Sequence, residues 1–254
     1  MATEEVTAVL VDTEDDQQIS SLKSSEATSV IIMDPCIYRV PPLLRKMNEE
    51  ACTPSLVSIG PFHHQNQTLK PMQDLKFSYY NKFLERTPPQ NSLDVYAEAV
   101  TEWEDKIRHC YYWSIPMASF EFVSMILTDG CFIIELFVSV FLSATGESNE
   151  DTNLLMERWP RSDIMRDLIL LENQIPFFVL QGLFNLAFPS RLNGNSFLEL
   201  AYKNFQYTFL TCIYPPNSKM FEKFSHNYFN DHHLTLPNGD RLQVEHLCDM
   251  LRAF

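Results

Sequence analysis

The sequence predicts a mainly α-helical protein, a helical bundle with a few short extended segments. Only 6 of the 254 residues are glycine, which is few for the tight turns of an all-β protein. Hydrophobic residues make up 45% of the chain, and 19 residues are phenylalanine, so a globular core is expected. Apolar side chains also recur at helical spacing, and two segments are apolar on nearly every side, as in the central helices of a bundle.

Charge and cysteine content exclude several classes of protein. The balance of 19 Lys+Arg against 33 Asp+Glu gives a net charge of -14, which opposes binding to a phosphate backbone, so we expect no nucleic acid partner. The cysteines form no CxxC pair and lie in apolar segments, which favours reduced, buried thiols over disulfides. They are Cys36, Cys52, Cys110, Cys131, Cys212 and Cys248.

The chain shows neither a secretion signal nor a membrane span. Residues 1–30 lack a basic start and an apolar stretch, so we expect a cytoplasmic location for this chain. The apolar run Cys131–Ala144 carries Glu135 and is shorter than the roughly 20 residues that cross a bilayer. We therefore expect no transmembrane segment in this chain.

The N-terminal part changes character near residue 30. Residues 1–30 are rich in acidic side chains and serine and predict a disordered acidic leader, followed by a helical domain over 31–254. Pro42 favours the first turn of a helix over about 42–51. The run 56–59, closed by Gly60-Pro61, predicts a short extended piece that ends in a turn.

Three helical segments follow. From Pro71 the apolar residues are spaced by three and four positions, which predicts a helix that ends before Pro88-Pro89. Ser92 is expected to cap a helix that extends to about residue 110. Ser119 is expected to cap a third segment over 120–128, which Asp129-Gly130 breaks or kinks before a helix over 131–142. Residues 144–153 then form a polar loop.

A polar triplet, Glu172-Asn173-Gln174, interrupts an otherwise apolar stretch directly before Ile175-Pro176. Proline cannot donate a hydrogen bond within a helix, so a first helix should end near Asn173 and a second should occupy about 177–186. Buried carboxylates and carboxamides need partners. We expect the triplet to satisfy these helix ends and to pair with an arginine such as Arg39 or Arg45.

The C-terminal part predicts two more helices. Ser196 and Glu199 form a capping box before a helix that includes Tyr202 and Phe209. A short extended segment over 234–236 and a turn at 237–239 should precede a last helix, about 242–252.

Several blocks of the chain resemble the plant family catalogued as domain of unknown function 247. The blocks are IYRVPPLLRKMNEEA with the following VSIGPFHH, LKPMQDLKFSYYNKFL, EFVSMILTDGCFIIELF, DLILLENQIPFFVLQGLF and HLCDMLRAF. The resemblance implies a plant protein without an established enzymatic activity. Relatives in that family are usually longer, many end in an apolar segment that resembles a membrane anchor, and some grass members are implicated in pollen self-incompatibility.

This chain departs from the family pattern in three places. It has Thr53 where an aromatic residue is common and Gln65 where glycine commonly follows the histidine pair. It also stops after HLCDMLRAF, so we expect a member truncated at its C-terminus. Full-length relatives are expected to be membrane-anchored, which does not carry over to this chain.

Candidate sites point to structure more than to chemistry. The histidine pairs 63–64 and 232–233 lack metal-ligand spacing, so we expect no metal and no cofactor. Glu135 and Glu172 could act as a catalytic acid and base, but pairing with arginines is the stronger interpretation, and no catalytic residue is assigned. The predicted structural polar network contains Glu172, Asn173, Gln174, Glu135, Arg39 and Arg45.

These observations favour a non-enzymatic interaction or recognition protein, with a role in signalling or self-recognition implied only by the resemblance. Its partners would be proteins, paralogues or a small peptide. One alternative is an acid/base hydrolase that uses Glu135, Glu172 and His63. Another is a truncated, nonfunctional product of a longer membrane-associated gene.

Overall fold

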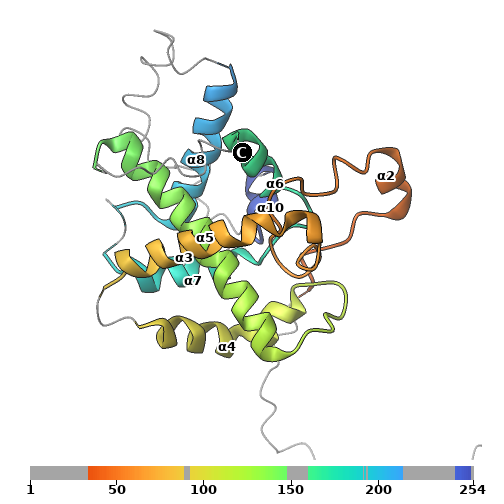
Figure 1. The fold of residues 1–254 in the computed structure, drawn as a ribbon, viewed down its shortest axis with the longest axis horizontal. Coiled ribbons are helices and arrows are strands. Elements are labelled where there is room, and N and C mark those ends of the chain that lie inside the picture. Colours follow the sequence, from red (N-terminus) through yellow and green to blue (C-terminus); the bar gives the residue numbers. More distant parts are fainter. Residues whose placement is uncertain are drawn as a thin grey trace, which may run out of the picture. The chain divides into compact units, whose positions relative to one another are not determined.

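Helices form nearly all of the regular structure. The computed structural model describes residues 34–88, 92–147, 160–190, 192, 194–213 and 244–252 (Figure 1). These residues form eight α-helices and one 3-10 helix and contain no named β-strand, which confirms the mainly α prediction. The elements are α2 (Pro42–Met47), η1 (Gln67–Leu69), α3 (Pro71–Arg86), α4 (Leu93–His109), α5 (Ser119–Thr145), α6 (Arg161–Asp167), α7 (Phe177–Ala187), α8 (Phe197–Ile213) and α10 (Leu247–Arg252).

The long helix α5 is the centre of the unit formed by Asp34–Phe254. It packs against α3, α4, α7 and α8 (Figure 1). The expected break at Asp129-Gly130 is wrong, because α5 continues through both residues. A Cβ at Gly130 would lie 2.7 Å from Leu183 Cδ1, so the glycine allows α7 to approach α5 closely.

Three of the predicted helices begin as the sequence indicates. Helix α3 begins at Pro71, and α4 follows Ser92, although the Ser92 side chain makes no capping hydrogen bond. The capping box before α8 is confirmed. The backbone N–H of Ser196 donates to Glu199 Oε2 at 2.7 Å, and the N–H of Glu199 donates to Ser196 Oγ at 3.3 Å.

The region around the polar triplet differs from the prediction in one respect. Helix α6 ends at Asp167, well before the predicted end near Asn173, while α7 begins directly after Pro176 as expected. Carbonyl oxygens just past the end of α6 accept hydrogen bonds from side-chain amides of the triplet. The helix therefore stops where side chains replace the backbone donors that would continue it.

The remaining segments are irregular. Helix α2 ends at Met47, four residues before the predicted end, and none of its residues is buried. Ile37 and Tyr111 form an isolated parallel bridge that joins the first described segment to the end of α4. The predicted leader (1–30) and the extended segment and turn over 234–239 lie outside the described residues. The last helix, α10, begins at Leu247, later than the predicted start near residue 242.

One described helix, α5, is long and apolar enough to cross a membrane by length and composition alone. Most of it is buried against the neighbouring helices, and a core helix of a bundle passes the same test.

Candidate functional site

The loop between α6 and α7 contains the polar triplet and is almost fully buried. Glu172, Asn173 and Gln174 are exposed by 3% or less. Pro176, with φ -60° and ψ 136°, directs the chain into α7. Buried polar groups without partners would cost about 1–3 kcal/mol each, so their hydrogen bonds decide whether this loop is stable.

Asn173 connects this loop to the segment that precedes Gly60. Its Oδ1 accepts the N–H of Ile59 at 2.7 Å. Its Nδ2 donates to the carbonyl oxygens of Val57 at 2.9 Å and Asp167 at 2.8 Å. One carboxamide thus forms hydrogen bonds with three backbone groups, which a neighbouring β-strand would bind in a sheet.

Asp167, the last residue of α6, binds the same segment. Its carboxylate accepts the backbone N–H of Ser55 at 3.0 Å, of Leu56 at 2.7 Å and of Val57 at 3.1 Å. Asp167 is not among the residues that the sequence predicts for the polar network. A useful signal was present, because Asp167 lies inside the same apolar stretch as the triplet.

Gln174 holds its own loop closed. Its Nε2 donates to the carbonyl oxygens of Leu168 and Leu170, each at 2.8 Å, and its backbone oxygen accepts the Tyr111 hydroxyl at 3.0 Å. Gly60 packs against this backbone oxygen. A Cβ at Gly60 would lie only 2.4 Å from it, and φ at Gly60 is +71°, so both space and backbone conformation favour glycine.

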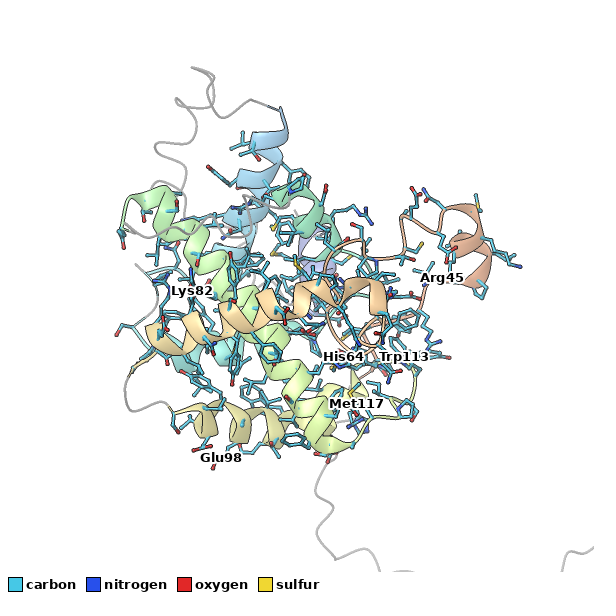
Figure 2. All side chains as sticks on the ribbon, viewed as in Figure 1. Arg45, His64, Lys82, Glu98, Trp113 and Met117 are labelled. Atoms are coloured by element: carbon cyan, nitrogen blue, oxygen red, sulfur yellow. The ribbon has the colours of Figure 1, made fainter. Side chains whose placement is uncertain are left out.

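Glu172 anchors the segment that leads into α2. Its Oε1 accepts the N–H of Val40 at 2.7 Å, and its Oε2 forms an ion pair with Arg45. Arg45 belongs to α2, which lies at the edge of the helical bundle (Figure 2). His63 Nε2 lies 3.9 Å from Glu172 Oε2, and burial, together with the positive charge of Arg45, lowers the pKa of His63 to about 4.

A second buried ion pair lies next to this loop. Asp129 of α5 accepts Lys76 Nζ at 2.5 Å and the N–H of Gly60 at 2.8 Å. Lys76 also donates to the carbonyl oxygen of Ser58. The sequence predicts for Asp129 only a break or a kink in a helix. In the structure Asp129 binds Gly60 directly and Ser58 through Lys76.

Two members of the predicted network lie elsewhere. Glu135 Oε1 accepts Arg86 Nε and the Ser139 hydroxyl, each at 2.7 Å, and burial raises the pKa of Glu135 although both bonds oppose this. Its Oε2 has no hydrogen-bond partner. The Arg39 guanidinium stacks 4.6 Å from the Phe62 ring and 4.9 Å from the Trp113 ring, so Arg45 is the arginine that pairs with Glu172.

The described residues contain no group of three or more potential metal ligands. The pair 232–233 lies outside those residues, and His63 is already adjacent to Arg45, a cation that disfavours a bound metal. A depression of about 830 Å³ is lined by residues 48–50, 53–55 and Arg166. Neither Glu135 nor Glu172 lines it, so these two carboxylates do not meet there.

A surface of exposed apolar residues lies beside the polar network. Leu43 and Met47 are exposed by 77% and 81%, and the exposed rings of Tyr38 and Tyr112 are 5.4 Å apart. We call Tyr38, Leu43, Leu44, Met47 and Tyr112 the α2 surface. Three basic residues, Arg39, Arg45 and Lys46, lie between Tyr38 and Met47 in the sequence. Aromatic residues and arginine beside exposed aliphatic side chains are typical of protein interfaces.

Comparison with known proteins identifies relatives but no reaction. The family model of domain of unknown function 247, described as plant protein of unknown function, matches residues 37–254. The UPF0481 protein At3g47200 of Arabidopsis thaliana is 37% identical over 166 residues, which are 64% of this chain and 34% of the relative. The putative UPF0481 protein At3g02645 of the same plant is 28% identical over 162 residues, 64% of this chain and 29% of the relative. This chain thus aligns with about a third of each relative's length. No solved structure matches it significantly.

Proposed function

The chain belongs to the plant protein family designated domain of unknown function 247, and we propose that it acts without catalysis, by binding another protein through the α2 surface. The observation that supports this proposal is the exposure of Leu43, Leu44 and Met47 on a helix with no buried residue. Exposing three large apolar side chains on one short helix is unfavourable unless a partner covers them.

The partner that fits this surface is a protein segment with apolar and acidic side chains. The apolar side chains would pack on α2 and on the tyrosine pair. Arg39 and Lys46 are exposed and would attract carboxylates of the partner. An anionic membrane is the less favoured partner, because the net charge of -14 opposes its approach.

The hydrolase alternative has weaker support. Glu172 is bonded to Arg45 and Glu135 to Arg86, so each carboxylate already has a cationic partner. A general acid or base must reach a substrate atom from a shared pocket, and the two side chains belong to different clusters. The polar network therefore fits better with a supporting role, in which Glu172 holds the base of α2 in place.

The test compares the wild-type protein with a Leu43→Ser, Leu44→Ser, Met47→Ser triple variant. Tagged protein captures partners from plant tissue, the partner is identified by mass spectrometry, and the purified partner is then titrated calorimetrically. Each leucine or methionine that a partner buries contributes about 1.5–3 kcal/mol, so loss of even one such contact should weaken binding about tenfold and loss of all three by much more. Phe120→Ser is the matched control, because Phe120 is 86% exposed on a different helix.

Equal affinity of the triple variant and the wild-type protein would refute the role of the α2 surface. Failure of the wild-type protein to bind any purified candidate would refute the interaction function and favour a nonfunctional product. Binding to phosphatidylserine vesicles that the triple variant loses, without any protein partner, would assign the surface to membranes instead.

A further inference from the structure

Cys36 and Cys110 face each other across the parallel bridge. The N–H groups of Cys36 and Ile37 both donate to the carbonyl oxygen of Cys110 at 2.9 Å, and the N–H of Tyr112 donates to Ile37 at 3.0 Å. The bridge pairs Ile37 with Tyr111, so the preceding residues, Cys36 and Cys110, are opposite each other. Such residues have Cα atoms about 4.8 Å apart, within the range of about 4.4–6.8 Å that a disulfide requires.

The side chains on this face are also in contact. Two residues farther along each segment, the rings of Tyr38 and Tyr112 lie 5.4 Å apart. Cys110 itself keeps a helical backbone conformation at the end of α4, with φ -66° and ψ -20°, so the tyrosine contact alone does not fix its side chain. The hydrogen bond between the two thiols places the Cys110 side chain beside that of Cys36. We propose that Cys36 and Cys110 are a redox-sensitive pair that a hydroperoxide converts into a disulfide.

The two thiols differ in a way that assigns their roles. Hydrogen bonding between them lowers the pKa of Cys110 and raises that of Cys36, and burial also raises the pKa of Cys36. Cys110 is 2% exposed, whereas Cys36 is only partly buried. Access and not thiol acidity sets the order: a small oxidant reaches Cys36 first, and the raised pKa of Cys36 makes this step slow and strongly pH-dependent. The lowered pKa of Cys110 suits it to act as the resolving thiol.

The reaction takes place in two balanced steps. The Cys36 thiolate attacks one peroxide oxygen, an S–O bond forms, the O–O bond breaks and hydroxide leaves, which gives a sulfenic acid. The Cys110 thiolate then attacks the Cys36 sulfur, an S–S bond forms and the second hydroxide leaves. Each hydroxide takes up a thiol proton, so two thiols and one hydrogen peroxide give one disulfide and two waters.

The consequence of the disulfide is local. It would join the end of α4 covalently to the segment that enters α2, without requiring the proposed partner. Amide hydrogen exchange at Ile37 and Tyr112 should slow, because their hydrogen bonds belong to the bridge that becomes fixed. The proposal is independent of the interaction function, since it concerns only this chain and its oxidation.

Peptide mapping tests the proposal. The full chain is treated with hydrogen peroxide and then unfolded in denaturant that contains iodoacetamide, which alkylates the remaining free thiols. It is then digested without reduction. A linked Cys36–Cys110 peptide, lighter by two hydrogens than the sum of the free peptides, is the expected product. Its rate of formation should rise about tenfold per pH unit between pH 7 and 9, since only the thiolate reacts. Met47 is 81% exposed, and its sulfoxide shows that the oxidant was active.

Single variants provide the controls. Cys110→Ser should abolish the linked peptide and leave Cys36 to accumulate sulfinic acid, while Cys52→Ser should form the link as the wild-type protein does. The proposal is overturned if Met47 is oxidised while Cys36 and Cys110 are both alkylated. It is equally overturned if Cys36 is linked to another cysteine. Peptide mapping of the wild-type protein tests the proposed disulfide even if a variant fails to fold.

Discussion

Replacing Asn173 with alanine should destabilise the protein strongly. The substitution leaves three buried backbone groups without their partner: the N–H of Ile59 and the carbonyl oxygens of Val57 and Asp167. Each unsatisfied group costs about 1–3 kcal/mol, so the free energy of unfolding should fall by about 3 kcal/mol or more. For a domain of this size, each kcal/mol lowers Tm by about 2–4 °C, so Tm should fall by about 6 °C or more.

The assay is urea unfolding followed by circular dichroism, with calorimetry for Tm. Asn66→Ala is the matched control, because Asn66 Oδ1 accepts two exposed hydrogen bonds, from the N–H and from the hydroxyl of Thr68. It should cost only about 1 kcal/mol. Asn173→Asp, which retains an acceptor but loses both donors, should also be strongly destabilised. If Asn173→Ala costs no more than Asn66→Ala, the reasoning about the polar triplet is wrong.

Three further predictions concern other buried groups. Because the pKa of His63 falls from 6.5 to about 4 on folding, only the unfolded chain binds this proton in that range. The free energy of unfolding should therefore fall by up to about 3 kcal/mol as pH drops from 6.5 to 4. In urea titrations at several pH values, His63→Gln should reduce this dependence on pH, and an unchanged dependence would contradict the prediction. The raised pKa of Glu135 means that folding disfavours its charged form. Glu135→Gln should thus lower the free energy of unfolding by less than about 1 kcal/mol at pH 7. As pH falls through the folded pKa of Glu135 toward 4.5, the free energy of unfolding of the wild-type protein should rise relative to that of the variant. A larger cost at pH 7 would show that folding favours the charged form. Gly60 and Gly146 have similar φ values, +71° and +73°, but only Gly60 has a neighbour within 4 Å of an added Cβ. Gly146→Ala should cost about 1 kcal/mol and Gly60→Ala about 3 kcal/mol or more in the same unfolding assay, and equal costs would show that the contact with Gln174 is unimportant.

The sequence predicts the helices with long regular patterns well. The helix from Pro71 and the capping box at Ser196 are recognisable because the signals are local: a proline at the first turn and two side chains three residues apart. The signal at Asp129-Gly130 is equally local but has another cause. Glycine occurs there for close contact with Leu183, which only the folded structure reveals.

The candidate site is only partly predictable for the same reason. Charged or amide side chains inside apolar stretches are visible in the sequence, and that criterion selects Glu172, Asn173 and Glu135. Applied consistently, it would also have selected Asp129 and Asp167. The partners are not predictable, because their separations along the chain, such as 127 residues between Arg45 and Glu172, carry no local signal.

The buried acceptors have a common task that explains why a helical protein contains so many of them. Backbone N–H groups of Ser55, Leu56, Val57, Ile59 and Gly60 all donate to side chains. Residues 57–60 of this segment are buried without a helix or a paired strand, so their amides need other acceptors. Asp167, Asn173 and Asp129 provide those acceptors, and Glu172 does the same for Val40. The polar triplet, Asp129 and Asp167 therefore replace a β-ladder. Their carboxylates are occupied by structural hydrogen bonds, which leaves the exposed α2 surface as the better place to look for function.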